Sequence, residues 1–499
     1  MGPPSPLLED DCALMSVEID GGSLTADDLV RVARGGEHVT LAPSAAERVS
    51  KGRAVVEAAL ARGDEVYGLT TGVGERKSVR LEPAEIDAYN RLLILNHRVG
   101  QRPMAEPDTV RATMLRLANG LAAGTVGVRP ELVQLVVAAL NSNSTPAMRS
   151  RGSIGQADLA PMADLAHGLL EGSAFRLGAG EGLALIDNNA FSTGMGALAV
   201  WDCGRLFDTL DVAVALSFEA FSANLSILDA SVAASRPFPG VLATIERLRS
   251  LLEESDLWGS EASRNLQDPL CFRTLPQVHG TARDVYGFVS TQLQLELNVS
   301  QGNPVVDPER GTIRGAGNFD AFALTAALDQ LRVVLATVLT SAAERCLKLV
   351  HAPFSGLPHG LAAREGLAED AFNMFGVSVQ AFAAEARALA APVSYEVVST
   401  TQAAGIEDRA TMAPLSASRL AEMVSIAQGI AAVELCVAAQ GVDLRPGRRR
   451  GAGAASARDL VREIVAVLGE GEPAPQDLEP LIDLVRDGRF AAIATGEPG

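Results

Sequence analysis

The stretch Gly-Ser-Ile-Gly-Gln-Ala-Asp-Leu-Ala-Pro, residues 152–161, decides the fold assignment for this chain of 499 residues. A polar linker, residues 142–151, leads into it. Only Gln156 and Ala157 stand between Gly155 and Asp158, so this inner part holds no serine. The sequence around it changes in character. The first third mixes short segments with glycines, and the remainder is dominated by long helical patterns.

Long apolar patterns with helical spacing fill the later part of the chain. Residues 318–352 contain neither glycine nor proline, which allows one helix of roughly 50 Å at about 1.5 Å per residue. Similar patterns occupy residues 196–228, 380–391 and 415–440. Helices of this kind pack in bundles and often against other subunits. We therefore predict a mainly α protein, with a mixed N-terminal domain over 1–195 and a long helical bundle with peripheral C-terminal helices over 196–499.

Composition excludes several classes of partner. The formal net charge of −19 argues against nucleic acid, because no basic surplus is available to replace counterions on a phosphate backbone. The N-terminal residues lack the pattern of a signal peptide, and we recognise no apolar run long enough to span a bilayer. The apolar stretch 333–339 is flanked by Asp329, Arg332 and Glu344, which is typical of a core helix.

Cysteine and histidine usage gives no metal site. The five cysteines are an odd number without a C-x-x-C pair, and the six histidines are scattered. Reduced thiols of this kind are typical of a cytoplasmic protein. We therefore expect a cytoplasmic protein that binds a small molecule and interacts with neither membrane nor nucleic acid.

Further motifs follow one another in a fixed order around residues 152–161. They are Tyr-Gly-Leu-Thr-Thr-Gly-Val-Gly (67–74), Leu-Ile-Leu-Asn-His-Arg-Val-Gly (93–100), Leu-Ile-Asp-Asn-Asn-Ala-Phe-Ser-Thr (185–193), Gln-Asp-Pro-Leu-Cys-Phe-Arg-Thr-Leu-Pro-Gln (267–277), Gly-Asn-Pro (302–304), Gly-Asn-Phe-Asp (317–320), Gly-Ile-Glu-Asp-Arg (405–409) and Met-Ala-Pro (412–414). Together they resemble the ammonia-lyase family that acts on histidine, phenylalanine and tyrosine, over about residues 67–414. The resemblance implies that family's fold and a homotetramer in which loops from three subunits build each site.

The resemblance breaks at the prosthetic group. The family reads Gly-Ser-Val-Gly-Ala-Ser-Gly-Asp-Leu-Ala-Pro, and its Ala-Ser-Gly tripeptide cyclises and dehydrates into an electrophilic methylidene-imidazolone. That chemistry needs the serine Cβ as an exocyclic methylene and an unhindered glycine nitrogen. Gln156 and Ala157 supply neither. We therefore predict a chain with no cofactor at this divergent position.

The matched positions imply a set of site residues. Tyr67 corresponds to the catalytic base, which needs a pKa well below the reference of about 10. Asp187 replaces an asparagine that contacts the substrate amine, and its carboxylate would hold a cation or transfer a proton. Leu270 replaces a second catalytic tyrosine. The remaining matches are the catalytic Glu407 and the substrate-binding residues His97, Arg273 (the carboxylate clamp), Gln277, Asn303 and Phe319.

Three functions are compatible with these residues. The first is a cofactor-independent, lyase-type enzyme of specialised metabolism, which catalyses a base-initiated elimination, addition, isomerisation or cyclisation on an amino-acid-like or carboxylate-bearing molecule. Its substrate would bring its own activation, because without the electrophile most of the barrier reduction has no other source. The second is a true ammonia-lyase for histidine or an aromatic amino acid that works by another route. The third is a non-catalytic homologue that binds an amino-acid-like ligand.

Overall fold

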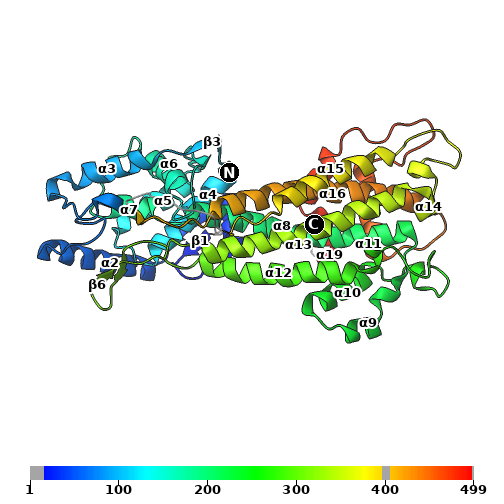
Figure 1. The fold of residues 1–499 in the computed structure, drawn as a ribbon, viewed down its shortest axis with the longest axis horizontal. Helices are drawn as coiled ribbons and strands as arrows, with labels where there is room; N and C mark the ends of the chain where they lie inside the picture. Colours follow the sequence, from blue (N-terminus) through cyan, green and yellow to red (C-terminus); the bar gives the residue numbers. More distant parts are fainter. Residues whose placement is uncertain (1–15, 396–404, 497–499) are drawn as a thin grey trace, which may run out of the picture. The chain divides into compact units, whose positions relative to one another are not determined.

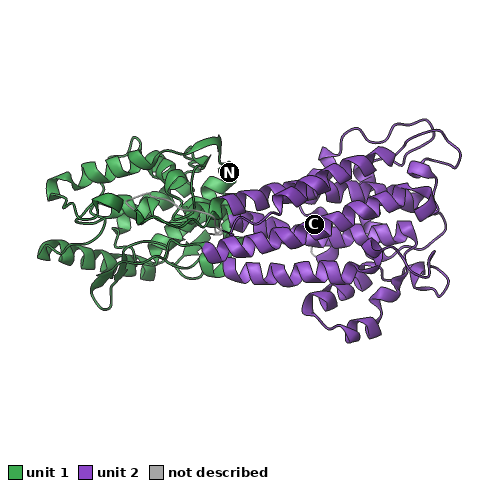
Figure 2. Ribbon diagram, viewed as in Figure 1, with its two compact units in different colours: residues 1–195, 294–321, 398–414 green, residues 196–293, 322–397, 415–499 purple. Residues whose placement is uncertain are grey.

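The computed structural model describes residues 16–395 and 405–496, and the chain divides into two compact units (Figure 2). Unit 1 comprises residues 1–195, 294–321 and 398–414, and unit 2 comprises 196–293, 322–397 and 415–499. The first boundary lies between Met195 and Gly196. Unit 1, however, also takes two later segments from the part assigned to the bundle. They reach it because the long helices α8 (Ala190–Phe221), α12 (Leu275–Glu296) and α16 (Ala413–Asp443) each run through a boundary.

Unit 1 is built mainly from helices (Figure 1). Helix α4 is buried along almost its whole length, and it packs against α1, α2 and α5. A helix buried on all sides belongs to the core rather than to the surface. The helices wholly within this unit are α1 (Ala26–Ala33), α2 (Pro43–Arg62), α3 (Ile86–His97), α4 (Pro107–Ala122), α5 (Pro130–Asn141), α6 (Leu159–Leu170) and α7 (Glu181–Ile186), with the 3-10 turns η1 (Gly74–Arg76) and η2 (Pro83–Glu85).

Three two-stranded sheets complete the described part of unit 1. β1 (Ser16–Ile19) pairs in parallel with β2 (His38–Leu41). β5 (Val305–Asp307) pairs antiparallel with β6 (Thr312–Arg314). β3 (Gln101–Met104) pairs antiparallel with β4 (Arg149–Arg151), which ends just before Gly152. Since β3 closely follows the end of α3, this last sheet brings α3 to the stretch 152–161.

Local signals explain where the first helices start and stop. Thr25 caps α1 because its hydroxyl oxygen accepts a hydrogen bond from the backbone N–H of Asp28, and the Asp28 carboxylate accepts one from the backbone N–H of Thr25. Helix α2 starts with Pro43 in its first turn, where the missing N–H costs nothing. It ends at Gly63, whose φ of +73° is a left-handed conformation that glycine adopts without strain.

Unit 2 is a bundle of long helices, which confirms the predicted mainly α fold (Figure 1). Its helix α13, of 29 residues, packs extensively against α15. Besides its parts of α8, α12 and α16, the unit contains α9 (Ala230–Ser235), α10 (Pro239–Leu251), α11 (Leu270–Arg273), α13 (Phe322–Val350), α14 (Ala352–Ser355), α15 (Asn373–Leu389), α17 (Ala452–Ile464), α18 (Glu479–Arg486) and α19 (Arg489–Thr495), with the 3-10 turns η3 (Leu225–Leu228), η4 (Asp256–Trp258) and η5 (His359–Leu361).

Two bundle helices differ from the expectation that no apolar run could span a bilayer. By length and composition alone, α13 and α16 are long and apolar enough to do so. Their most apolar windows are 61% and 72% buried within the chain, as is usual for core helices. Helix α13 also carries Asp329 and Arg332, which pair with each other and are both buried. These features agree with the core helix predicted around residues 333–339.

The described cysteines are all free thiols. Cys203, Cys346 and Cys436 are buried, and Cys271 is partly exposed. Burial raises the pKa of each of these four thiols above its usual value. They therefore act as small apolar side chains of the bundle.

A buried ion pair joins two bundle helices. The guanidinium of Arg345 on α13 lies 2.6 Å from the carboxylate of Glu434 on α16, and neither side chain is accessible to solvent. Ser217 on α8 donates a further hydrogen bond of 2.8 Å to the same carboxylate. Three helices are therefore held in register by one carboxylate, whose removal leaves a buried, unpaired guanidinium.

We expect Glu434→Gln to lower the free energy of unfolding by about 3–5 kcal/mol, the usual effect of removing one partner of a buried pair. Thermal melting of the purified protein measures this as a clear fall in melting temperature. The matched control is Glu470→Gln, because Glu470 pairs with Arg364 at the surface, where both side chains are more than half exposed. Equal melting temperatures for the two variants would contradict the prediction.

Candidate active site

A pocket with a volume of about 560 Å³ lies in unit 1. Its walls come from the glycine-rich loop 67–74, the end of α3, the stretch 152–160, α7 and the later segments of the unit. The structure thus brings together residues that are far apart in the sequence. Eight of the ten predicted site residues line it: Tyr67, His97, Gln156, Ala157, Asp187, Asn303, Phe319 and Glu407.

Tyr67 enters the pocket from a tight loop. Gly68 has a φ of +69°, and a Cβ there would stand 2.3 Å from the side chain of Leu183, so the position requires glycine. The Tyr67 hydroxyl oxygen accepts a hydrogen bond of 3.0 Å from the backbone N–H of Gly74, which closes the loop. Burial raises the pKa of Tyr67, and the charges of Asp187 and Glu407 raise it further, against the lowering effect of the Gly74 N–H.

That shift has the opposite sign from the one a tyrosinate base needs. In this pocket the phenol keeps its proton unless positive charge arrives near it. A substrate with a cationic group would supply such charge. Tyr67 is therefore protonated in this pocket, and a cationic ligand would favour its ionisation.

His97 ends helix α3 and faces the same pocket. Its Nδ1 lies 2.8 Å from the carbonyl oxygen of Leu93 one turn earlier. A carbonyl only accepts, so Nδ1 must carry the proton in this arrangement. The neutral ring then offers Nε2 as an acceptor to a ligand.

The stretch 155–158 is tied to three other parts of unit 1. The carbonyl oxygen of Gly155 accepts hydrogen bonds from the Thr411 hydroxyl at 2.7 Å and from the Asn189 amide at 3.2 Å. Gln156 donates through Nε2 to the carboxylate of Asp320 at 3.2 Å. Asp158 is fully buried and accepts two hydrogen bonds from Ser192, from its backbone N–H and its hydroxyl.

These residues do not fit a methylidene-imidazolone. Gln156 and Ala157 have no hydroxyl whose loss would leave an exocyclic methylene. The nearest serine, Ser153, is followed by Ile154 rather than by a glycine. The backbone at Ala157 has a φ of +51°, so the loop still makes a sharp turn although the tripeptide is missing.

Asp187 is a nearly buried carboxylate at the end of α7. Its side chain lines the pocket, and only 8% of the residue is exposed. Burial raises the pKa of Asp187 to about 8; the backbone N–H of Asn303 opposes this rise, and the charge of Glu407 adds to it. The carboxyl group is consequently poised to change protonation when a charged ligand enters.

Asn303 and Phe319 line the pocket and lie at the two ends of the segment 303–319, which contains the β5–β6 sheet. The side-chain oxygen of Asn303 accepts a hydrogen bond of 2.9 Å from the backbone N–H of Ala316. The carbonyl oxygen of Phe319 accepts one of 3.4 Å from the N–H of Ala157. Both residues therefore have a structural role in closing the pocket, in addition to the binding role that the resemblance implies.

Arg273 and Gln277 do not line this pocket. Both belong to unit 2, where Arg273 is exposed at the end of α11 and donates to the side chain of Gln267 at 2.9 Å. Arg273 lines another cavity of about 350 Å³, together with Arg264, Asp268 and other residues of unit 2. The carboxylate clamp therefore stays a prediction.

Tyr89, a residue near the pocket, escaped the sequence analysis. It lies on α3, where burial raises its pKa and the charge of the Tyr67 phenol raises it further. Asp320 belongs to the motif 317–320, but its contact with Gln156, 164 residues away, was not predicted. No local pattern points to Tyr89 or to this contact, since both arise from packing in unit 1.

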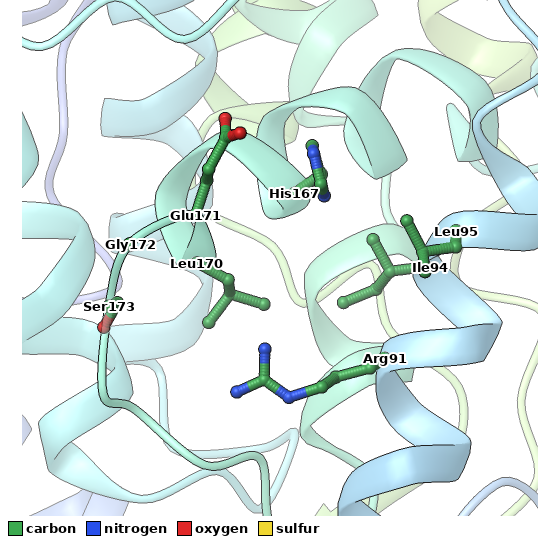
Figure 3. A pocket seen from close by; sticks show the side chains of 8 residues that line it. All are labelled: Arg91, Ile94, Leu95, His167, Leu170, Glu171, Gly172 and Ser173. Atoms are coloured by element: carbon green, nitrogen blue, oxygen red, sulfur yellow. The ribbon is translucent and has the colours of Figure 1, made fainter.

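Another cavity in unit 1, of about 280 Å³, contains none of the predicted residues. Figure 3 shows Arg91, Ile94 and Leu95 of α3 opposite His167 and Leu170 of α6, with Glu171, Gly172 and Ser173 on the loop that follows. Helices α3 and α6 also contribute to the walls of the larger pocket. The two cavities therefore share helices but no lining residue.

Known proteins share both the sequence and the fold. The profile of the family described as aromatic amino acid lyase matches residues 24–175 and 170–463. A histidine ammonia-lyase from Anaeromyxobacter sp. (strain K) is 34% identical over 503 residues, which cover 94% of this chain and 98% of that protein. This chain belongs to the aromatic amino acid lyase family. The resemblance inferred from the motifs is thereby confirmed.

Solved structures agree with this assignment. Histidine ammonia-lyase from Trypanosoma cruzi has a TM-score of 0.89 and 28% identity, with 97% of this chain and 96% of that chain covered. The ergothioneine-degrading enzyme ergothionase from Treponema denticola also has a TM-score of 0.89, with 26% identity and coverage of 95% and 99%.

One functional expectation is wrong. The sequence analysis favoured a cofactor-independent enzyme of specialised metabolism, with a base-initiated elimination, addition, isomerisation or cyclisation on an amino-acid-like or carboxylate-bearing molecule. Histidine ammonia-lyases are 30–34% identical to this chain over almost their whole length, which favours a true ammonia-lyase instead. The loss of the tripeptide removes one group, whereas most of the pocket positions are retained.

We expect Asp187→Asn to gain in melting temperature relative to the parent protein as pH rises from 4 to 8. The folded chain has an Asp187 pKa of about 8, whereas an unfolded aspartate has one of about 3.9. Between these values the folded state holds more protons than the unfolded state, so the parent loses stability as pH rises. Asparagine does not titrate and escapes this loss. A difference between the two proteins that stays constant with pH would contradict the assignment.

Proposed function

We propose that this protein is a carbon–nitrogen lyase that eliminates the α-amino group of histidine or of a closely similar amino acid. The observation that carries the proposal is the 34% identity to a histidine ammonia-lyase over 94% of the chain. The shared pocket of Tyr67, His97, Asn303 and Glu407 supports it, because these residues match the family positions that surround the substrate.

In this proposal the residues divide the work as follows. His97 accepts a hydrogen bond from the substrate ring through Nε2. Asp187 and Glu407 hold the amino group as a cation. Tyr67 removes a proton from Cβ once that cation has offset the two carboxylates. The product is an α,β-unsaturated acid.

The route does not use the family's electrophile. The chain has no serine from which to form it at residues 155–158, so we propose an enzyme that works without a prosthetic group. The reacting nitrogen must then leave by virtue of its own charge. Exclusion of water by the half-buried loop 67–74 strengthens every electrostatic contact in such a site.

Assembly is part of the same proposal. We propose a homotetramer whose site receives Arg273 and Gln277 from another copy. Exposed apolar side chains on bundle helices, such as Phe288 on α12, Val333 on α13 and Phe382 on α15, favour burial against further helices. The free, buried thiols favour the cytoplasm.

Tyr67→Phe should lower turnover by at least about 100-fold, the low end for loss of a general base. The ring stays in place, so folding and melting temperature should change little. Histidine, N-methylated histidines, phenylalanine and tyrosine are incubated with the protein, and the unsaturated acid is followed by its ultraviolet absorbance. Tyr395→Phe is the matched control, because Tyr395 is 70% exposed. Turnover of Tyr67→Phe close to that of the control would show that the phenol is not the base. No product from any member of the panel would contradict the proposed function.

The intact mass of the purified protein should equal that of the sequence. A methylidene-imidazolone requires the loss of two water molecules, and the chain lacks the serine for it. Mass spectrometry of the undigested protein, with peptide mapping across residues 149–176, checks this directly. A mass lower by two waters, localised to that peptide, would overturn the proposal of a route without the group.

A further inference from the structure

We propose that the pocket in unit 1 is a seat for a quaternary ammonium group, made by the carboxylates of Asp187 and Glu407 and the rings of Tyr67 and Phe319. The substrate would accordingly be an amino acid with a histidine-like skeleton whose α-nitrogen is fully alkylated. This inference rests on the proposed function and narrows it from a reaction type to a class of substrate.

The charge of the pocket is the first argument. Among the described residues that line it, Asp187 and Glu407 are acidic and none is lysine or arginine. The nearby guanidinium of Arg409 is directed to Asp320, at 3.8 Å. A carboxylate as buried as Asp187 is costly to ionise without a partner. A permanent positive charge on the ligand provides that partner at every pH.

The aromatic side chains are the second argument. Tyr67 and Phe319 line the same pocket as the two carboxylates. Aromatic faces attract a cation through the negative potential of the ring, and they suit quaternary ammonium groups, which have no N–H to donate. Carboxylates and rings together are the chemistry of a site that recognises charge rather than hydrogen bonds.

The neutral acceptors of the pocket are the third argument. A primary ammonium group carries three N–H donors that need acceptors. The side-chain oxygen of Asn303 is engaged by the N–H of Ala316. The carbonyl oxygen of Gly155 already accepts from Thr411 and Asn189. The Ser153 hydroxyl already accepts from the backbone N–H of Gly155, and His97 Nε2 is assigned to the substrate ring in the proposed function. The pocket therefore offers a primary ammonium group chiefly the two carboxylates.

The chemistry of departure is the fourth argument. A base in this pocket would take a proton from a primary ammonium group before it took one from carbon, since the reference pKa of an α-amino group is only about 8. The resulting neutral amine is a much poorer leaving group when no electrophile is present. A quaternary nitrogen has no proton to lose. The base takes the Cβ proton, the C–H electron pair forms the Cα–Cβ double bond, and the C–N pair stays on nitrogen, which departs as a neutral tertiary amine.

The test is a series of substrates that differ only in methylation of nitrogen: histidine, Nα,Nα-dimethylhistidine and Nα,Nα,Nα-trimethylhistidine. We expect kcat/KM for the trimethyl compound to exceed that for histidine by at least about 100-fold, with trimethylamine released in equal amount to the unsaturated acid. The dimethyl compound has nearly the same bulk but a removable proton, so it separates charge from size. It should resemble histidine.

Substitutions at Phe319 and Asp187 test whether these residues bind the quaternary ammonium group. Phe319→Leu keeps an apolar side chain but removes the ring face, and it should weaken binding of the trimethyl compound by about tenfold in calorimetry. Asp187→Asn should weaken the same binding by at least as much. Glu171→Gln is the matched control, because Glu171 lies in the separate cavity of Figure 3 and should leave binding unchanged. Melting temperatures show that each variant is folded.

The outcomes separate this inference from the proposed function. Turnover of histidine equal to or faster than that of the trimethyl compound would overturn the inference and leave the lyase function standing. Tight binding of the trimethyl compound that depends on Asp187 and Phe319, with no turnover of any compound, would support the seat and overturn the lyase function. Absence of binding of the trimethyl compound at millimolar concentration would overturn the inference.

Discussion

The close approach at Gly155 is the constraint on which the candidate site depends. Its φ is +82°, and a Cβ there would lie 2.2 Å from the hydroxyl oxygen of Thr411 and 2.8 Å from the backbone nitrogen of Ala413. Only glycine allows the stretch 152–161 to pass this near to the start of α16. The same carbonyl binds Asn189, next to the turn that presents Asp187. One residue thus fixes the loop of Gln156, the end of α7 and the segment of Glu407 around a single pocket.

The electrostatics of the pocket follow from that convergence. Asp187 and Glu407 come from distant parts of the sequence and meet near the hydroxyl of Tyr67. The charges of Asp187 and Glu407 add to the effect of burial on the pKa of Tyr67, and the charge of Glu407 adds to it for Asp187, so the phenol and the Asp187 carboxyl hold their protons. A cation beside them would favour ionisation of both groups. Binding of a cationic substrate would then also activate the Tyr67 phenol as a base, in a site that has no electrophile of its own.

The motifs were sufficient to predict the family and the mainly α fold, because they match short, irregular loops that a scaffold uses only for its site. They also singled out residues from Tyr67 to Glu407 that the structure gathers in one pocket. The motifs could not predict that Gln156 donates a hydrogen bond to Asp320, or that the side-chain oxygen of Asn303 accepts one from the N–H of Ala316. Both contacts arise from tertiary packing. Arg273 shows a different limit: a motif names a residue but not where the fold places it, and Arg273 lines a cavity of unit 2 rather than this pocket. The missing tripeptide led to a wrong functional expectation, because it removes a single group whereas most positions of the pocket are retained.

Because the thiols are buried in the bundle, their chemical labelling can report local separation of the bundle helices. Cys203, Cys346 and Cys436 are inaccessible, and their raised pKa values keep them as unreactive thiols in the folded chain. Cys203 lies on α8, Cys346 on α13 and Cys436 on α16. An alkylating reagent added to the native protein consequently modifies these positions only when the corresponding helix separates from its neighbours. The rate of labelling at each cysteine would rank the helices of the bundle by how often each one opens, without any engineered probe.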